Sequence, residues 1–290
     1  MNTHFEMKTV AMQGLKGAYH EMAARKYFED QEIEILSCKH FRDVIEAVKK
    51  DSNTIGIMAI ENTIAGSLLQ NHELIRESNL KVIGEQKIRI SHSLAVLPGE
   101  TLETIREVNS HPIALMQCRN YLDTLNNVKV VETEDTASSA KQIAEENLTN
   151  HATICSRYAA EMYGLEVIDE GIETNKRNFT RFLLIATPWM ADELIDDAKI
   201  SKSSLVFTLP HTEGSLSKVL TILSFYDVNL TKIQSLPILG KEWEYLFYVD
   251  LTFSNILKYK QSLDAVRPLT KEFRILGEYQ ENNHTNNCQA

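Results

Sequence analysis

The chain has 290 residues, of which 43% are hydrophobic and 24% charged, the balance of an ordinary globular protein with one large or two modest domains. A formal net charge of −10 argues against a protein that binds nucleic acid non-specifically. The four cysteines lie far apart, no apolar run reaches the roughly 20 residues of a membrane span, and the polar N-terminus lacks the apolar core of a signal peptide. We therefore expect a reduced, cytoplasmic protein. We expect no metal site, no nucleic-acid partner and no membrane partner.

A glycine turn follows the first predicted strand, residues 9–12, and leads into a helix predicted at 20–28. The turn, Gln13–Tyr19, contains Lys16. Backbone N–H groups and the positive end of a helix meet at such a turn, and a carboxylate or phosphate is their natural ligand. An ordinary tight turn is the alternative, because this spacing is not that of a dinucleotide-binding loop.

The second candidate site is the end of a buried strand predicted at 55–60, which follows a strand at 33–37 and a helix at 41–48. Glu61, Asn62 and Thr63 come directly after it. Open α/β sheets bind ligands at the carboxyl ends of their strands. The alternative is that Asn62 or Thr63 caps the next helix, which extends to about residue 77.

Residues 82–98 alternate in part and predict one long strand with His92 on its apolar face, where a hydrogen-bonded core histidine is commoner than a catalyst. We expect a helix near 104–108 and another opened by Pro112, with Gln117 off its buried stripe. Further strands at 128–131, 152–155 and 165–168 alternate with helices that begin at about 135 and at 158. This alternation predicts mixed or parallel sheets with helices on both faces.

The stretch Asn175–Phe182 is a polar, doubly basic loop that runs into an apolar strand. Thr180 and Arg181 stand at the junction, where a strand holds a loop still and ligand groups are often found. For this tripeptide alone, a β-favouring threonine beside a solvated arginine is the alternative.

The alternation of predicted strands and helices ends at an acidic segment near 190–202, which we take as a linker. Residues 203–280 then predict a ferredoxin-like βαββαβ module, with strands at 203–209, 229–238, 243–253 and 272–279 and helices at 214–227 and 255–267. The polar, Asn-rich end predicts disorder. The predicted domains are therefore 7–190, 200–280 and a disordered tail at 281–290.

Five motifs in order resemble those of the prephenate dehydratase family: Lys16-Gly-Ala-Tyr-His-Glu-Met-Ala23, Ile60-Glu-Asn-Thr63, Ser110-His-Pro with Ala114-Leu-Met-Gln-Cys118, Asp135-Thr-Ala137, and Asn178-Phe-Thr-Arg-Phe182. The module after them is similar to the ACT domain that binds amino acids in that family. The resemblance implies an α/β fold with a two-lobed catalytic domain like a periplasmic binding protein, a cleft between the lobes, and a C-terminal ferredoxin-like ACT domain. Because no chorismate mutase segment precedes these motifs, we expect a monofunctional enzyme.

The resemblance also implies the reaction: prephenate loses carbon dioxide and its ring hydroxyl to give phenylpyruvate, in the biosynthesis of phenylalanine, without a cofactor. Such a site needs a donor at the leaving hydroxyl and cations or N–H groups at the carboxylates. The family implies Thr180 as the donor, with Asn62 and Gln117 as further catalytic residues. The implied substrate-binding residues are Lys16, Gly17, Ala18, Glu61, Thr63, Arg181 and Phe182.

The same resemblance implies phenylalanine as an effector and a homodimer or homotetramer formed through the ACT domains. The implied effector site consists of Gly214, Ser215, Leu216, Asn229, Leu230, Gln234 and Ser235. The chain departs from the family pattern in Lys16–His20, and Gln234-Ser-Leu-Pro237 stands where Glu-Ser-Arg-Pro is usual. Two other functions stay open: an arogenate dehydratase, and a protein that binds an amino acid without catalysis.

Overall fold

The computed structural model describes residues 7–29, 31–238, 240 and 244–282. Through the first two hundred residues the strands are β1 Lys8–Gln13, β2 Ile33–Cys38, β3 Thr54–Asn62, β4 Gly66–Ser67, β5 Lys81–Arg89, β6 Ser93–Val96, β7 Glu107–Ser110, β8 Lys129–Glu132, β9 His151–Cys155, β10 Glu166–Glu170 and β11 Phe179–Ala186. The helices between them are α1 Tyr19–Phe28, α2 Phe41–Lys50, α3 Leu69–Ser78, α4 Pro112–Gln117, α5 Arg119–Leu122, α6 Thr136–Glu145, α7 Arg157–Met162 and α8 Pro188–Leu194, followed by the 3-10 helix η1 Asp197–Lys199.

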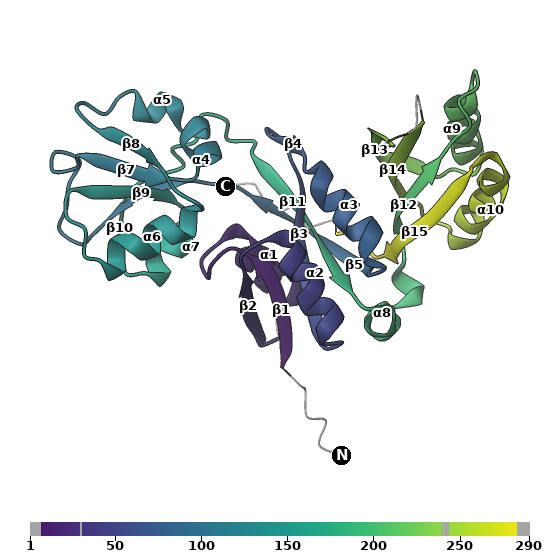
Figure 1. Ribbon diagram of the computed structural model, residues 1–290, viewed down its shortest axis with the longest axis horizontal. Helices are drawn as coiled ribbons and strands as arrows, with labels where there is room; N and C mark the ends of the chain where they lie inside the picture. Colours follow the sequence, from purple (N-terminus) through teal and green to yellow (C-terminus); the bar gives the residue numbers. More distant parts are fainter. Residues whose placement is uncertain (1–6, 30, 239, 241–243, 283–290) are drawn as a thin grey trace, which may run out of the picture. The chain divides into compact units, whose positions relative to one another are not determined.

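These strands form two sheets (Figure 1). The first has the order β2-β1-β3-β11-β5, with β4 paired to β3, and the second has the order β10-β6-β9-β7-β8. In the second sheet β7 is parallel to β8 and β9, whereas β6 is antiparallel to β9 and β10. The predicted α/β fold with mixed sheets is therefore confirmed.

Helices cover both faces of the second sheet, as the hydrophobic clusters show. Leu115, Cys118 and Leu122 pack against one face. Ala137 and Ala140 of α6, with Ala159 and Ala160 of α7, pack against the other face. Local sequence signals set the helix starts: Pro112 occupies the first turn of α4, and Asp135 caps α6 by accepting from the Ser138 N–H.

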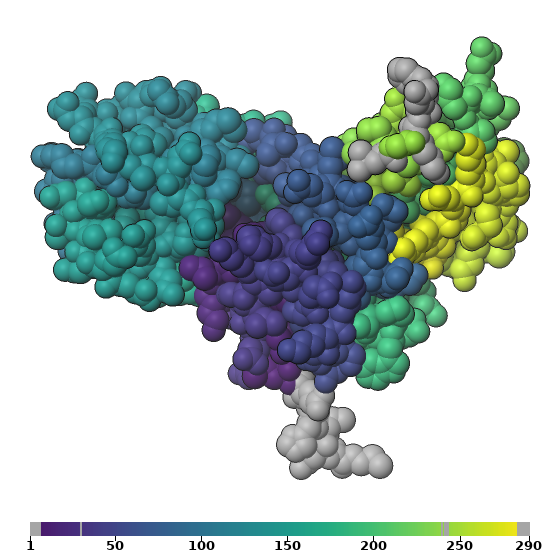
Figure 2. Space-filling view, viewed as in Figure 1, coloured from purple at the N-terminus to yellow at the C-terminus, as the bar shows by residue number. Residues whose placement is uncertain are grey.

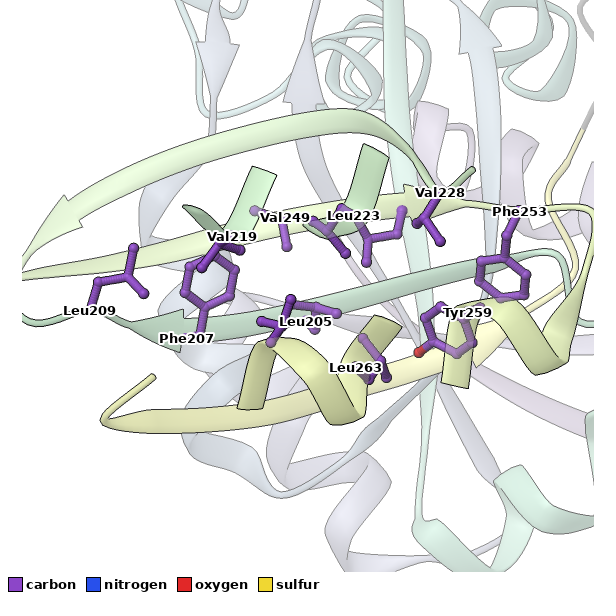
Figure 3. Close-up of a cluster of buried hydrophobic side chains, with 12 residues drawn as sticks. Leu205, Phe207, Leu209, Val219, Leu223, Val228, Val249, Phe253, Tyr259 and Leu263 are labelled. Carbon is purple, nitrogen blue, oxygen red and sulfur yellow. The ribbon is translucent and has the colours of Figure 1, made fainter. Parts of the chain in front are cut away.

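The ferredoxin-like module consists of β12 Lys202–Thr208, α9 Ser215–Phe225, β13 Asn229–Pro237, β14 Tyr245–Thr252, α10 Ile256–Val266, the 3-10 helix η2 Arg267–Leu269 and β15 Glu272–Tyr279. Its antiparallel sheet has the order β13-β14-β12-β15, which confirms the predicted βαββαβ topology. Both helices pack on this sheet through a shared core in which Phe253 stacks on Tyr259, with 4.0 Å between ring centroids (Figure 3).

Two predicted elements are wrong. The expected helix near 104–108 is absent from the described residues, and 107–110 form β7, paired on both sides. The long strand expected at 82–98 is interrupted after Arg89, so that β5 belongs to the first sheet and β6 to the second. Alternation could not reveal the interruption, because the alternating buried side chains continue through it, from Ile88 and Ile90 to Leu94.

Contacts divide the chain into two compact units: 1–44, 57–67 and 86–182 form one, and 45–56, 68–85 and 183–290 form the other. The boundaries 7–190 and 200–280 stay predictions. Most of the predicted tail lies outside the described residues; Glu281 and Asn282 are described and hydrogen-bond to Ser201 and Glu85. In the described part of the chain, no helix is both long and apolar enough to span a membrane.

Candidate active site

The end of β3 and the start of β11 bring Asn62 and Thr180 together. These strands are neighbours in the first sheet. Asn62 Nδ2 donates to Thr180 Oγ1 at 3.0 Å and to Asn178 Oδ1 at 2.7 Å. Two of the three predicted catalytic residues therefore share a direct hydrogen bond.

The orientation of the Asn62 amide is fixed by the backbone. Asn62 Oδ1 accepts from the N–H groups of Ile64 at 2.9 Å and Ala65 at 2.8 Å, and a backbone N–H can only donate. The amino group of Asn62 must therefore face Thr180. Thr180 Oγ1 accepts that bond, and among the described residues its own hydrogen has no acceptor. The Thr180 hydroxyl can therefore donate one further hydrogen bond.

Gln117, the third predicted catalytic residue, joins the same network through Asn178. Its Oε1 accepts from Asn178 Nδ2 at 2.9 Å and lies 2.9 Å from His92 Nε2. The backbone secures the same loop, because the Ile90 N–H donates to the Asn178 carbonyl and the Thr174 N–H to the Gln117 carbonyl. The structure therefore unites Asn62, Gln117 and Thr180 in one hydrogen-bonded cluster.

His92 is 2% exposed and links the network to α1. Its Nδ1 lies 3.2 Å from the hydroxyl of Tyr19, which donates to the Ser91 carbonyl at 2.7 Å. Burial lowers the pKa of His92, against weaker opposing effects of the Gln117 hydrogen bond and the Glu173 charge. The ring is therefore neutral at pH 7.

Arg181 and Glu61 lie on the other side of the two strands. Neighbouring residues of a strand point to opposite faces, so the side chains beside Asn62 and Thr180 cannot share their face. Arg181 is 6% exposed, and its Nη1 lies 3.4 Å from Glu61 Oε1. The structure does not bring this pair to the Asn62–Thr180 cluster, and its role in substrate binding stays a prediction.

The glycine turn before α1 is occupied by the protein itself. The Gly17 N–H donates to Glu21 Oε2 at 2.7 Å, and the Ala18 N–H donates to the Leu15 carbonyl at 3.1 Å. Lys16 is exposed. A carboxylate does sit at this turn, as its chemistry predicts, but it belongs to Glu21.

Two further predicted binding residues support the site from within. The Thr63 hydroxyl donates to the Arg177 carbonyl and accepts from the Phe179 N–H, both at 3.0 Å, so it holds the loop before β11. Phe182 is 1% exposed, with its ring centroid 4.9 Å from that of His20. Neither Asn62 nor Thr63 caps α3, whose N-cap is Leu68, so the capping alternative is wrong.

Sequence reasoning missed Asn178 and Tyr19 and treated His92 as a core residue. Asn178 stands two residues before Thr180 in the same motif, which is the signal that could have identified it. Tyr19 likewise stands in the first motif, beside Ala18, whereas His92 lies outside the five motifs and only the fold joins it to Tyr19. Across the described ranges, no group of three or more His, Cys, Asp or Glu side chains could hold a metal ion.

The predicted effector residues lie in the ferredoxin-like module. A cavity of about 160 Å³ is lined by Ser215 and Leu216 together with Leu209, Pro210, His211, Thr212, Tyr245 and Phe247. Gly214, with a positive φ of 73°, is the N-cap of α9, and Leu230 packs against the module core. Asn229 is exposed, and Gln234 Nε2 donates to the Ser235 carbonyl. Of the seven predicted residues, only Ser215 and Leu216 line this cavity.

Comparison with known proteins gives consistent results. The family model described as prephenate dehydratase matches residues 10–189. Arogenate dehydratase/prephenate dehydratase 2, chloroplastic, of Arabidopsis thaliana is 37% identical over 284 residues, covering 93% of this chain and 72% of that protein. The structure of a prephenate dehydratase from Arthrobacter aurescens in complex with L-Phe is 26% identical, with a TM-score of 0.81 over 94% of this chain and 89% of that one.

A third structure, described as a novel type of quorum quenching acylase, is 28% identical, with a TM-score of 0.84 over 95% of this chain and 99% of its own. It shares the fold, and the family model, which matches residues 10–189, spans the site described above. The chain belongs to the prephenate dehydratase family, whose members are carbon–oxygen lyases that eliminate water.

Proposed function

We propose that this protein converts prephenate to phenylpyruvate, carbon dioxide and water. The bond from the ring to the departing carboxylate breaks and its electron pair enters the ring. The ring hydroxyl leaves with its bonding pair and becomes water by taking up one proton, which solvent supplies. The reaction is strongly favourable once the hydroxyl is helped to leave. A positioned hydrogen-bond donor at that hydroxyl is therefore the main requirement.

One observation carries this proposal: the backbone-fixed amide of Asn62 donates to Thr180 Oγ1 and leaves the threonine hydrogen available. A threonine hydroxyl is a weak acid, so Thr180 acts as a donor that strengthens its bond as the hydroxyl departs. The amide of Gln117 orients the substrate from the opposite end of the same network. Lys16, exposed at the glycine turn, supplies a cation for a carboxylate.

The first test is turnover of prephenate by Thr180 variants. Thr180→Val keeps the shape and removes the donor, so kcat should fall by about 10²–10³-fold, which corresponds to roughly 2.7–4 kcal/mol. Thr180→Ala should behave similarly, and Thr180→Ser should keep partial activity. Thr153→Val is the matched control, because Thr153 Oγ1 is buried and, within the described residues, has no hydrogen-bond partner. Thr180→Val within about threefold of wild type would remove Thr180 from the mechanism.

Asn62→Asp gives a sharper test of the donor orientation. Aspartate still accepts from the N–H groups of Ile64 and Ala65. Its second carboxylate oxygen now faces Thr180 and accepts the hydrogen bond that the Thr180 hydroxyl would otherwise donate to the substrate. Turnover by Asn62→Asp should therefore be below that of Asn62→Ala, although aspartate is the closer match in size. The reverse order would contradict the proposed orientation.

The substrate class needs a direct comparison, because the Arabidopsis relative carries both substrate names. Arogenate has an ammonium group where prephenate has a keto oxygen. We propose prephenate as the preferred substrate, and kcat/KM for both substrates decides between them. An acyl amide belongs in the same assay: hydrolysis without dehydration would replace this proposal by an acylase, and no product from any of the three at micromolar enzyme would favour a binding protein.

We further propose that phenylalanine inhibits the enzyme by binding at the cavity beside α9. The N–H groups at the start of α9 suit a carboxylate, and Leu209, Leu216 and Phe247 suit an aromatic side chain. Leu216→Arg should fill the cavity and weaken phenylalanine binding at least tenfold by calorimetry, with uninhibited turnover unchanged. Equal affinity in Leu216→Arg and wild type would exclude this cavity.

The module also has a sheet edge at β13 that suits pairing between copies, whereas β15 at the other edge contacts residues 76–82 of the same chain. We propose a homodimer at least, formed through residues 200–280. Light scattering of the whole chain tests this, and a monomer at micromolar concentration would refute it.

A further inference from the structure

We propose that His92 and Asn178 are positioning residues that hold the Gln117 amide in a single orientation, with its amino group presented to the ligand. This inference rests on the proposed function only for the identity of that ligand. The orientation itself follows from a hydrogen-bond network that begins at the backbone and passes through three side-chain amides to one histidine.

The first hydrogen bonds of this network fix the orientation of the Asn178 amide. The N–H groups of Ile64 and Ala65 fix Asn62 Oδ1, so Asn62 Nδ2 faces Asn178 Oδ1 at 2.7 Å. Asn178 must then turn its own amino group to Gln117, which accepts at Oε1 over 2.9 Å. Each step follows because an amide oxygen only accepts and an amide nitrogen only donates.

The second part fixes the tautomer of His92. The Gln117 oxygen cannot donate, so His92 Nε2, 2.9 Å away, must carry a hydrogen. The buried ring is neutral, hence Nδ1 is bare and can only accept. The Tyr19 hydroxyl, 3.2 Å from Nδ1 and 2.7 Å from the Ser91 carbonyl oxygen, must then share its one hydrogen between these two acceptors. The His92 backbone N–H donates to Glu173 Oε2 at 2.9 Å, which holds the residue in place.

Gln117 therefore meets two donors on one side. Reversing its amide would direct the amino group at both Asn178 Nδ2 and His92 Nε2, and two hydrogen bonds would become two donor–donor contacts. In the observed orientation Gln117 Nε2 has no acceptor among the described residues, and it is not among the fully buried unpaired atoms. Its N–H groups are free to donate to an acceptor on the substrate, such as a carboxylate.

The direct test is the tautomer. Ring ¹⁵N spectra of the histidine-labelled protein at pH 7 should show His92 with a protonated Nε2 and a bare Nδ1. His92→Phe, or His92→Gln if the first variant does not fold, identifies the signal by its loss. The opposite tautomer would overturn the proposal, because Gln117 would then face His92 with its amino group.

The functional test is a double-mutant cycle on kcat/KM for prephenate. If His92 acts through Gln117, His92→Phe and Gln117→Ala should each lower kcat/KM by about 10–100-fold, and the double variant should lose little more than either alone. Additive losses would overturn the positioning role. His72→Phe, a buried histidine on α3 outside this network, is the matched control and should keep wild-type kcat/KM.

Gln117→Glu distinguishes the role of the accepting oxygen of the Gln117 side chain from the role of its donating amino group. Glutamate keeps the oxygen that accepts from Asn178 and His92, so the His92 tautomer should stay as in wild type, while kcat/KM should fall at least tenfold because the outward donor is lost. Wild-type-like turnover of Gln117→Glu would overturn the role of that donor. A wild-type protein inactive on prephenate would refute the proposed function alone, since the tautomer result still decides the orientation.

Discussion

The ion pair between Lys202 and Glu85 joins the first strand of the ferredoxin-like module to β5. Lys202 Nζ lies 2.8 Å from Glu85 Oε1 and 3.0 Å from Oε2, and the side chains are only 3% and 0% exposed. Around it, Arg274 Nη1 donates to the Arg76 carbonyl at 2.6 Å, and Gly277 of β15 lies against Val82 of β5. Figure 2 shows the yellow end of the module beside the blue segment that contains α3. Lys202→Met would leave the Glu85 carboxylate buried without its counter-ion.

The size of the effect follows from that burial. Breaking a buried pair by removing one partner costs about 3–5 kcal/mol, whereas replacing both partners by apolar groups is often neutral. Lys202→Met and Glu85→Leu should therefore each lower the free energy of unfolding by about 3–5 kcal/mol, and the double variant should be more stable than either. At about 2–4 °C per kcal/mol, each single variant should lose roughly 6–20 °C in Tm.

Guanidinium unfolding followed by tryptophan fluorescence measures these differences. Lys49→Met is the matched control, because Lys49 pairs with Glu46 at 3.1 Å while both side chains are exposed, and it should cost no more than about 1 kcal/mol. A Lys202→Met cost below about 1 kcal/mol, or a double variant as unstable as the sum of the singles, would refute the reasoning.

Two further predictions concern stability. Gly277→Ala should destabilise by about 3 kcal/mol or more, because its Cβ would lie 2.0 Å from the Val82 carbonyl oxygen, a backbone atom that cannot move aside; an unchanged unfolding midpoint in guanidinium would contradict this. His20 has a pKa lowered to about 4 by burial, below its ordinary 6.5, so between these values the unfolded chain binds a proton that the folded chain does not. The free energy of unfolding should then fall by up to about 3 kcal/mol as the pH drops through that window, and His20→Phe should remove this part of the pH dependence. If the curves of unfolding free energy against pH for wild type and His20→Phe are parallel, His20 is not responsible.

Strand ends marked Asn62 and Thr180 as candidate ligand-binding residues, whereas their catalytic roles, and that of Gln117, were implied by the family resemblance. Asn62 follows a buried apolar run and Thr180 begins another, and the structure places these strands side by side. The separation of Arg181 from Thr180 was equally predictable, since strand residues alternate in direction. The motif alone suggested that both act together.

Other features depended on tertiary context. Residues 107–110 form a strand because β8 and β9 flank them in the second sheet, which no local pattern records. The tautomer of His92 depends on amides more than twenty residues away in the chain. Strand pairing and side-chain orientation arise only in the folded protein. A single sequence therefore predicts which residues form the hydrogen-bond network better than it predicts how their side chains are oriented.

The glycine turn shows why the chain can depart from the family pattern there without losing its shape. Tyr163 Oη donates to the Lys16 carbonyl at 2.6 Å, Ser156 Oγ donates to the Gly17 carbonyl at 3.3 Å, and Glu21 accepts from the Gly17 N–H. All three contacts use the backbone of the turn. A Cβ on Gly17, which has a φ of +94°, would lie 3.2 Å from Ala159 Cβ, so this position requires glycine, whereas none of the three contacts depends on the Lys16 side chain. Ala18 in turn packs into the apolar cluster of α6 and α7, where a hydroxyl would need a partner.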